Sequence, residues 1–92
     1  MIKSFRCQDT EALFAGRRVP RFANIERAAL RKLVQLSLAR VIDDMRAPPG
    51  NRLEALKGDR RGQWSVRINA QWRVCFRFED GDALDVEIVD YH

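Results

Sequence analysis

The chain has 92 residues, enough for one domain with a single modest core, and its 46% hydrophobic and 33% charged residues are typical of a globular protein. No apolar run approaches the roughly 20 residues of a membrane span, and the N-terminus M-I-K-S-F-R lacks the apolar core of a signal peptide. We therefore expect a cytoplasmic protein without a membrane partner. The net charge is +4, but residues 1–78 carry +10 and the last fourteen carry −6.

Most of the basic residues are arginines, whose forked guanidinium groups suit phosphate and carboxylate partners. Nucleic acid or an acidic protein is therefore the expected partner. The chain has two cysteines, Cys7 and Cys75, and a single histidine. This inventory predicts reduced, buried thiols rather than a disulfide or a metal site, and no metal or cofactor is expected.

The N-terminal residues predict a short strand followed by a short helix. Residues 2–6 are the strand candidate. Asp9 or Thr10 could cap a two-turn helix that runs to Phe14, and Gly16 could close that helix in a left-handed conformation. A basic connector follows around Pro20, which we expect to be either a solvated loop or a phosphate contact.

The main helix is expected to begin after Asn24 as its N-cap. Its apolar stripe, expected to lie in the core, consists of Leu30, Leu33, Val34, Leu38, Val41, Ile42 and Met45. Its polar face consists of Arg27, Arg31, Lys32, Gln35 and Arg40. Ser37 could start a new turn, so one long helix and two shorter helices both remain open. The sequence Pro48-Pro49-Gly50-Asn51 ends the helical half.

Beyond residue 51 the hydrophobic period changes to two, which predicts strands over 53–56, 63–68, 72–78 and 84–88. The expected apolar face consists of Trp64, Val66, Ile68, Trp72, Val74, Phe76, Phe78, Leu84, Val86 and Ile88. Turns are expected at Asn69-Ala70-Gln71 and at Asp80-Gly81. The pattern predicts an α+β fold in which one face of an antiparallel sheet packs on the helices and the other is polar and available.

The basic side chains of the polar face have two interpretations. Arg67, Arg73 and Arg77 could pair with Asp85 and Glu87 on a neighbouring strand, each pair contributing about 0.2–1 kcal/mol. Arg73 is less easily assigned to such a pair, because it lies near the hairpin turn. The other interpretation is a site that acts on a phosphodiester.

Phosphodiester cleavage needs cations for the nonbridging oxygens, a base for the attacking hydroxyl and an acid for the leaving oxygen. The candidate cations are Lys57, Arg60, Arg61 and Arg73. The chain end groups three titratable side chains, Asp90, Tyr91 and His92. An exposed tail residue is the alternative for His92, since one histidine supplies neither a metal cluster nor a triad. A nuclease built on this chain should be metal-free.

Several segments together resemble the HigB branch of the RelE/ParE toxin superfamily. They are the opening I-K-S-F-R, the block L-K-G-D-R-R-G-Q-W-S that follows P-P-G-N, the later W-R, and the terminal D-Y-H. The resemblance covers essentially the whole chain and is loosest over residues 17–47. It implies a single RelE-like domain over residues 1–92, with N-terminal helices packed on one face of a small antiparallel β-sheet.

By this resemblance the chain is the toxin of a type II toxin-antitoxin pair, a metal-independent mRNA endonuclease that depends on the ribosome. The 2′-hydroxyl would attack the adjacent phosphate, stabilised by Lys57 and Arg73. Asp90, Tyr91 and His92 would position the substrate and transfer protons, with His92 the favoured acid or base. The residues expected to contact RNA or the ribosome are Arg17, Arg18, Arg27, Arg31, Lys32, Arg60 and Arg61.

The resemblance also implies partners. They are a HigA-like helix-turn-helix antitoxin, the 70S ribosome at its decoding site with mRNA, and operator DNA reached only through the antitoxin. The alternative is a non-enzymatic toxin like the ParE branch, which inhibits DNA gyrase by binding. A pure binder has no chemical need for Lys57, Arg73 and His92 together. A third possibility is a relic that only binds its antitoxin.

Overall fold

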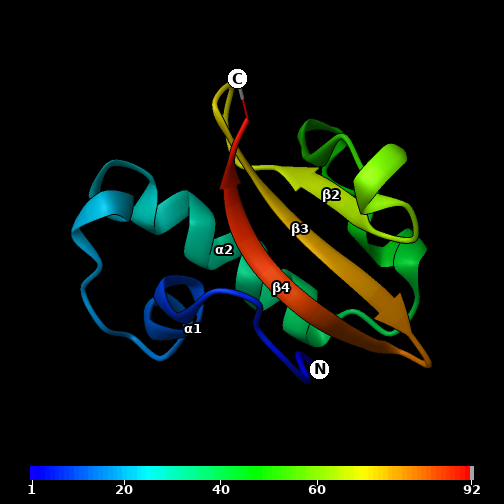
Figure 1. The fold of residues 1–92 in the computed structure, drawn as a ribbon, viewed down its shortest axis with the longest axis horizontal. Helices are drawn as coiled ribbons and strands as arrows, with labels where there is room; N and C mark the ends of the chain where they lie inside the picture. Colours follow the sequence, from blue (N-terminus) through cyan, green and yellow to red (C-terminus); the bar gives the residue numbers. More distant parts are fainter. Residues whose placement is uncertain (92) are drawn as a thin grey trace.

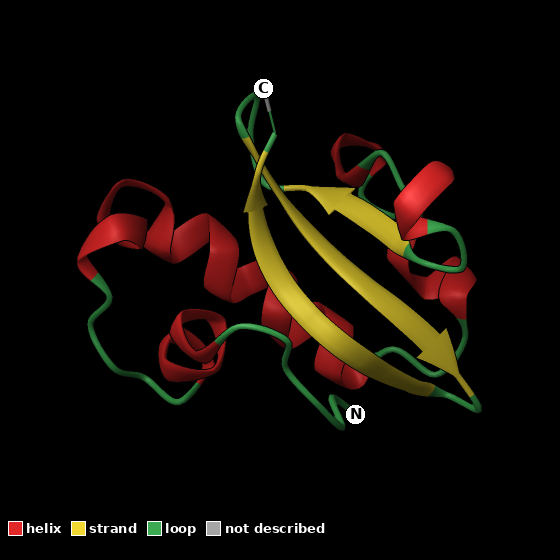
Figure 2. Ribbon diagram, viewed as in Figure 1, coloured by secondary structure: helices red, strands yellow, loops and turns green. Residues whose placement is uncertain are grey.

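The structure is a computed structural model that describes residues 1–91, so His92 lies outside the described part of the chain. Two helices pack against a four-stranded sheet (Figures 1 and 2), as predicted. The elements are α1 (Gln8–Phe14), η1 (Pro20–Ile25), α2 (Glu26–Leu38), η2 (Ile42–Met45), η3 (Pro49–Asn51), β1 (Glu54–Ala55), η4 (Gly58–Arg60), β2 (Trp64–Arg67), β3 (Trp72–Glu79) and β4 (Asp82–Asp90), where η marks a 3₁₀ turn.

The sheet has the order β1-β2-β3-β4, and every neighbouring pair is antiparallel. Both predicted turns are present. The Asn69 side chain accepts the backbone N–H groups of Gln71 and Trp72, and Asp80 and Gly81 have φ of +50° and +81°. The predicted N-terminal strand is an extended segment that makes two parallel bridges to β4, at Ile2 and Phe5. This segment covers the outer edge of β4, where it lies beside the strand in Figure 1.

Helix α1 also packs against the outer edge of β4. It begins after Cys7, and no side chain caps it, so the predicted cap at Asp9 or Thr10 is wrong. Thr10 is fully buried instead, and its hydroxyl accepts the backbone N–H of Ile88 at 3.0 Å. Because the helix starts at Gln8, both Asp9 and Thr10 lie inside its first turn rather than at the cap position. Gly16 closes the helix as predicted, with φ of +87°.

Helix α2 is shorter than the apolar pattern suggested. Its N-cap position falls one residue after Asn24, which makes no capping bond, so that prediction is wrong. The helix ends at Leu38, and the Asp44 carboxylate then accepts the N–H groups of Arg40 at 2.8 Å and Val41 at 3.2 Å. The helical region therefore consists of two pieces, α2 and the separate turn η2, rather than one long helix.

No helix among residues 1–91 is long and apolar enough to cross a membrane.

The early end of α2 changes which residues enter the core. Leu33 and Met45 are fully buried, and Ala29 and Leu36 complete the inner face of the helix. Three members of the predicted stripe are exposed instead: Val34 (47%), Leu38 (74%) and Val41 (56%). Val34 and Leu38 lie within α2 on the side opposite the buried Ala29, Leu33 and Leu36, and the extended residue after Leu38 separates Val41 from the helix.

A β-bulge in β4 makes the predicted alternation of this strand wrong at Leu84. Asp85 and Val86 together lie opposite Phe76, and Asp85 has φ of +53°. The extra residue shifts the alternation by one. Ala83 rather than Leu84 is therefore fully buried with the core, while Val86 and Ile88 face the core as predicted.

The polar face of the sheet is only partly available. Ser65 and Cys75, at its centre, have no exposed surface. Arg60 on η4 reaches this face and donates to Glu87 at 2.9 Å, which holds the turn over the sheet. The prediction of an open polar face is therefore wrong for its centre and holds only towards its edges.

Candidate active site

Arg73 on β3 is the most constrained basic residue of the polar face. Its side chain is only 16% exposed, and its Nη1 donates to the Ser65 hydroxyl at 2.6 Å. The same nitrogen lies 3.6 Å from a carboxylate oxygen of Glu54. Glu54 on β1 is the register partner of Ser65 on β2, so sheet pairing alone brings the carboxylate to the arginine. Arg73 thus has polar partners, but they are not the predicted Asp85 and Glu87.

Tyr91 follows the end of β4 and lies beside the same guanidinium. The Arg73 Cζ is 5.5 Å from the centroid of the Tyr91 ring, within the range of a cation–π contact. The backbone N–H of Tyr91 donates to the carbonyl of Gln71 in the β2–β3 loop, which fixes the start of the tail. The ring remains 37% exposed. A group bound here would meet both the aromatic ring and the cation.

A shallow pocket of about 340 Å³ joins these residues to Lys57. It is lined by Glu54, Ala55, Leu56, Lys57 and Tyr91. Lys57 is exposed, and Arg73 contacts the pocket through Glu54 and Tyr91. Three of the predicted catalytic residues, Lys57, Arg73 and Tyr91, therefore come together from three separate segments.

Asp90 faces a different hollow. Its carboxylate accepts a hydrogen bond from the Gln71 side chain at 3.1 Å, and it lines a second pocket of about 340 Å³ with Arg21, Arg60 and Trp72 among others. Successive residues of a strand point to opposite faces, which separates Asp90 from Tyr91. His92 follows immediately and lies outside the described residues, so its role stays a prediction.

Arg60 and Arg77 are held by acidic residues of β4 and its hairpin. Arg60 donates to Glu87, which raises the pKa of the Arg60 guanidinium against the opposing effect of its burial. Arg77 lies 3.3 Å from Asp85 and also pairs with Glu79, which confirms the predicted pairing of Arg77 with Asp85. The Arg60 guanidinium therefore already has an acidic partner in the fold. Its contact with RNA stays a prediction.

The other residues predicted to contact RNA are distributed over the surface. Arg17 and Arg18 are exposed in the loop after α1, Arg27 and Arg31 are exposed on α2, and Arg61 is exposed after η4. None of them lines the pocket of Lys57 and Tyr91.

Lys32 is the exception, because it is half-buried and donates to the side chain of Asn51. Burial, with a smaller effect from the charge of Arg31, lowers the pKa of Lys32. Lys32 therefore belongs to the polar support of the loop before β1, and its predicted contact with RNA gains no support from this placement.

Glu54 is the site residue that the sequence analysis missed. In the sequence it is an unremarkable acid in a two-residue strand, and only the β1–β2 register shows that it faces Ser65 and Arg73. Cys75 is a free thiol, as predicted, and its burial raises its pKa, so it stays neutral. Within residues 1–91, no three His, Cys, Asp or Glu side chains gather as metal ligands would.

Two solved toxin structures are similar to this chain in fold. One chain of the heterotetrameric YoeB-YefM toxin-antitoxin complex from Staphylococcus aureus superposes with a TM-score of 0.58 at 18% identity, covering 100% of this chain and 98% of that one. The YoeB/ParE toxin from Agrobacterium tumefaciens gives a TM-score of 0.51 at 20% identity, covering 99% of both chains. At these identities the likeness shows the fold, which is the RelE-like toxin fold.

Sequence comparison identifies the branch. A family described as "RelE-like toxin of type II toxin-antitoxin system HigB" matches residues 7–92, and the chain belongs to this family. Toxin HigB-1 of Vibrio cholerae serotype O1 is 46% identical over 63 residues, 68% of this chain and 66% of that toxin. Endoribonuclease HigB of Proteus vulgaris is 49% identical over 41 residues, 45% of each. These matches span about two thirds and about half of the two relatives.

Proposed function

We propose that this chain is an endoribonuclease toxin that cuts mRNA on the ribosome by attack of a 2′-hydroxyl on the adjacent phosphate. The carrying observation is a pocket lined by Lys57, Glu54 and Tyr91, with Arg73 beside it in contact with Glu54 and Tyr91. The name of the Proteus vulgaris relative, Endoribonuclease HigB, supports RNA cleavage as the activity. The rest of this proposal assigns a role to each side chain.

Lys57 and Arg73 would stabilise the phosphate as charge develops on its nonbridging oxygens. Lys57 is an exposed point charge, whereas Arg73 is held against Ser65 and Glu54. Both contacts of Arg73 use Nη1, and a guanidinium has five N–H donors in a fixed plane. A donor held in place before the reaction needs little reorganisation in the transition state, which is the main source of such electrostatic catalysis.

Glu54 is the carboxylate best placed to take the proton of the 2′-hydroxyl. It is 57% exposed and lies in the pocket with Lys57 and Tyr91. The leaving 5′ oxygen would receive its proton from the chain end, where Tyr91 lies at the pocket and His92 follows. Asp90, bonded to Gln71, would fix the direction of this tail.

The arginines outside the pocket suit the ribosomal setting. Arg17, Arg18 and Arg61 are exposed and would meet RNA phosphates in a salt-dependent, sequence-independent way. The 70S decoding site would supply the bound mRNA. A helix-turn-helix antitoxin would neutralise the toxin, and operator DNA would be reached only through that antitoxin.

The test adds the purified toxin to an mRNA that is being translated on purified 70S ribosomes. Primer extension then measures the rate of mRNA cleavage. Arg73→Ala should slow cleavage by about 10²–10³-fold, the effect typical of losing one preorganised donor. Arg77→Ala is the matched control, because Arg77 lies on the same strand but pairs with Asp85 outside the pocket. Its cleavage should stay within a few-fold of the wild type. Wild-type cleavage by a folded Arg73→Ala protein would refute the assignment.

Glu54 is tested by two substitutions that separate its possible roles. If the carboxylate accepts a proton, Glu54→Gln and Glu54→Ala should both lose roughly 10²–10⁴-fold. If Glu54 only orients Arg73, the amide of Glu54→Gln keeps an oxygen for that contact and should keep most of the activity. Growth arrest without any RNA cleavage, together with loss of gyrase supercoiling activity, would instead support the ParE-like alternative.

A further inference from the structure

The outward face of α2 carries a ridge that neither the core nor the candidate active site uses. We call it the α2 ridge: Arg27, Arg31, Val34 and Leu38 on the helix, and Val41 just beyond it. The helical residues are spaced four, three and four apart, so they lie one above another on one face. The opposite face holds the buried Ala29, Leu33 and Leu36, which fixes the ridge towards solvent.

The C-terminal half of the ridge is apolar and exposed. Val34, Leu38 and Val41 are 47%, 74% and 56% exposed. Within the described chain only Met1 and Tyr91 are other large hydrophobic side chains with comparable exposure. Single exposed apolar residues are ordinary, but three of five within eight residues form a cluster of the kind that marks an interaction surface.

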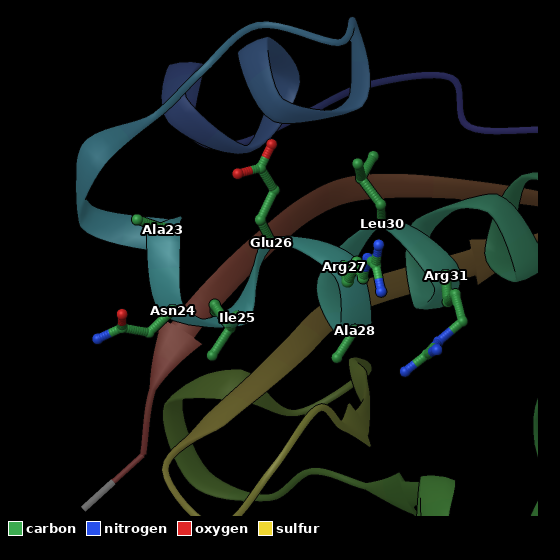
Figure 3. Close-up of a pocket in the computed structure, with 8 residues that line it drawn as sticks. All are labelled: Ala23, Asn24, Ile25, Glu26, Arg27, Ala28, Leu30 and Arg31. Carbon is green, nitrogen blue, oxygen red and sulfur yellow. The ribbon is translucent and has the colours of Figure 1, made fainter.

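The N-terminal half of the ridge is basic and unneutralised. Arg27 and Arg31 are exposed one helical turn apart, a spacing at which like charges repel. Neither makes an ion pair with an acid among residues 1–91. Both line an open hollow of about 610 Å³ at the start of α2, with Leu30 beside them (Figure 3). Glu26 lines the same hollow without pairing with either arginine.

We propose that the α2 ridge is the docking surface for the antitoxin, and that it takes an amphipathic helix with acidic residues at one end and apolar residues at the other. The acids would neutralise Arg27 and Arg31, and the apolar side chains would cover Val34, Leu38 and Val41. RNA is the weaker fit, because its phosphates would satisfy the arginines and leave three apolar side chains uncovered. The identity of the partner as an antitoxin rests on the proposed function.

Docking on the ridge is separable from cleavage. No ridge residue lines the pocket of Lys57 and Tyr91. Lys32, the remaining basic residue of this stretch, donates to Asn51 on another side of the helix. A ridge variant can therefore lose the antitoxin and keep the site intact. This assignment also moves Arg27 and Arg31 from the predicted RNA contacts to a protein interface.

The test measures the Kd of the antitoxin encoded in the same operon by biolayer interferometry, with toxin refolded after release from the complex. The double variant Val34→Ser/Leu38→Ser should raise the Kd at least about 30-fold, the size expected for losing a buried apolar anchor. Leu38→Met is the matched control, since it keeps the apolar contact and should stay within twofold. Both variants should arrest growth like the wild type when no antitoxin is expressed.

The charged half is tested by Arg31→Glu, which should raise the Kd about 10-fold at low salt and less at high salt. Arg6→Glu makes the same charge change at another exposed arginine and should stay within twofold. A Kd unchanged by the double variant overturns the proposal. The proposal is also overturned if the double variant binds 70S ribosomes more weakly than the wild type while its Kd for the antitoxin is unchanged. A wild-type toxin that cleaves no mRNA would refute the nuclease, and the antitoxin Kd would still decide the docking surface.

Discussion

The substitution Asn51→Ala tests how the fold holds the loop that leads into the candidate active site. Asn51 has no exposed surface and lies three residues before Glu54 in the chain. Its amide nitrogen lies within 3.1 Å of Gln35 Oε1, the Met45 carbonyl and the Ala47 carbonyl, and its oxygen accepts from the Lys32 ammonium. Two amide hydrogens serve three acceptors, so one hydrogen is shared.

Asn51→Ala removes two donor hydrogen bonds and one bond from a charged group. A neutral hydrogen bond contributes about 0.5–1.5 kcal/mol and a charged one about 1.5–3 kcal/mol. The expected loss is therefore about 2.5–6 kcal/mol, a large part of the 5–15 kcal/mol that is typical of a domain. For a chain of this size each kcal/mol lowers the Tm by roughly 4–8 °C. Cleavage activity should also fall, because Asn51 holds the loop that leads to Glu54, three residues further along the chain.

The assay is urea unfolding followed by circular dichroism, with the m-value compared between variants. Asn24→Ala is the matched control. Asn24 is exposed and caps nothing, so its substitution should change the free energy of unfolding by less than about 0.5 kcal/mol. A loss below about 1 kcal/mol for Asn51→Ala at an unchanged m-value would refute the account of this network. A loss of about 1 kcal/mol for Asn24→Ala would show a cap that the structure lacks.

Two further predictions concern single contacts. Thr10→Val keeps the side-chain shape but leaves the buried N–H of Ile88 without its acceptor, so calorimetry should show a loss of about 1–3 kcal/mol. A variant as stable as the wild type would contradict it. Hydrogen bonds from the backbone N–H groups of Arg40 and Val41 lower the pKa of Asp44 below its ordinary 3.8. The Tm advantage over Asp44→Asn should be complete above that value and lost as pH falls through the folded-state pKa. A constant difference down to strongly acidic pH would rule this out.

Much of the fold was predictable because it follows from local patterns. The period-two alternation of β2 and β3, the Asp80-Gly81 turn and the Gly16 helix end each depend on residues close in sequence. The same holds for Lys57, Arg73 and Tyr91 as candidates, because cations and titratable groups can be recognised by type. The proximity of Arg73 to the pocket of Lys57 and Tyr91 required the strands to pair in a particular register.

The errors lie where the boundaries, register or packed face of an element differ from the pattern expected from its own residues. Thr10 lies inside α1, which starts at Gln8, and its hydroxyl accepts the backbone N–H of Ile88 on β4. Leu84 left the core because the bulge at Asp85 shifts β4 by one residue against β3. Val34 and Leu38 are exposed because the sheet packs on the other face of α2, the face that carries Ala29, Leu33 and Leu36.

The sequence by itself therefore determined the α+β class, the hairpin, the excess of positive charge before residue 79 and the residue types able to bind a phosphate. Only the tertiary structure decided that Lys57 lines a pocket with Glu54 and Tyr91, that Arg73 contacts both of these residues, and that an apolar and basic ridge on α2 remains uncovered. Local patterns fix what each segment can become. Contacts between segments far apart in the chain decide where each side chain is used.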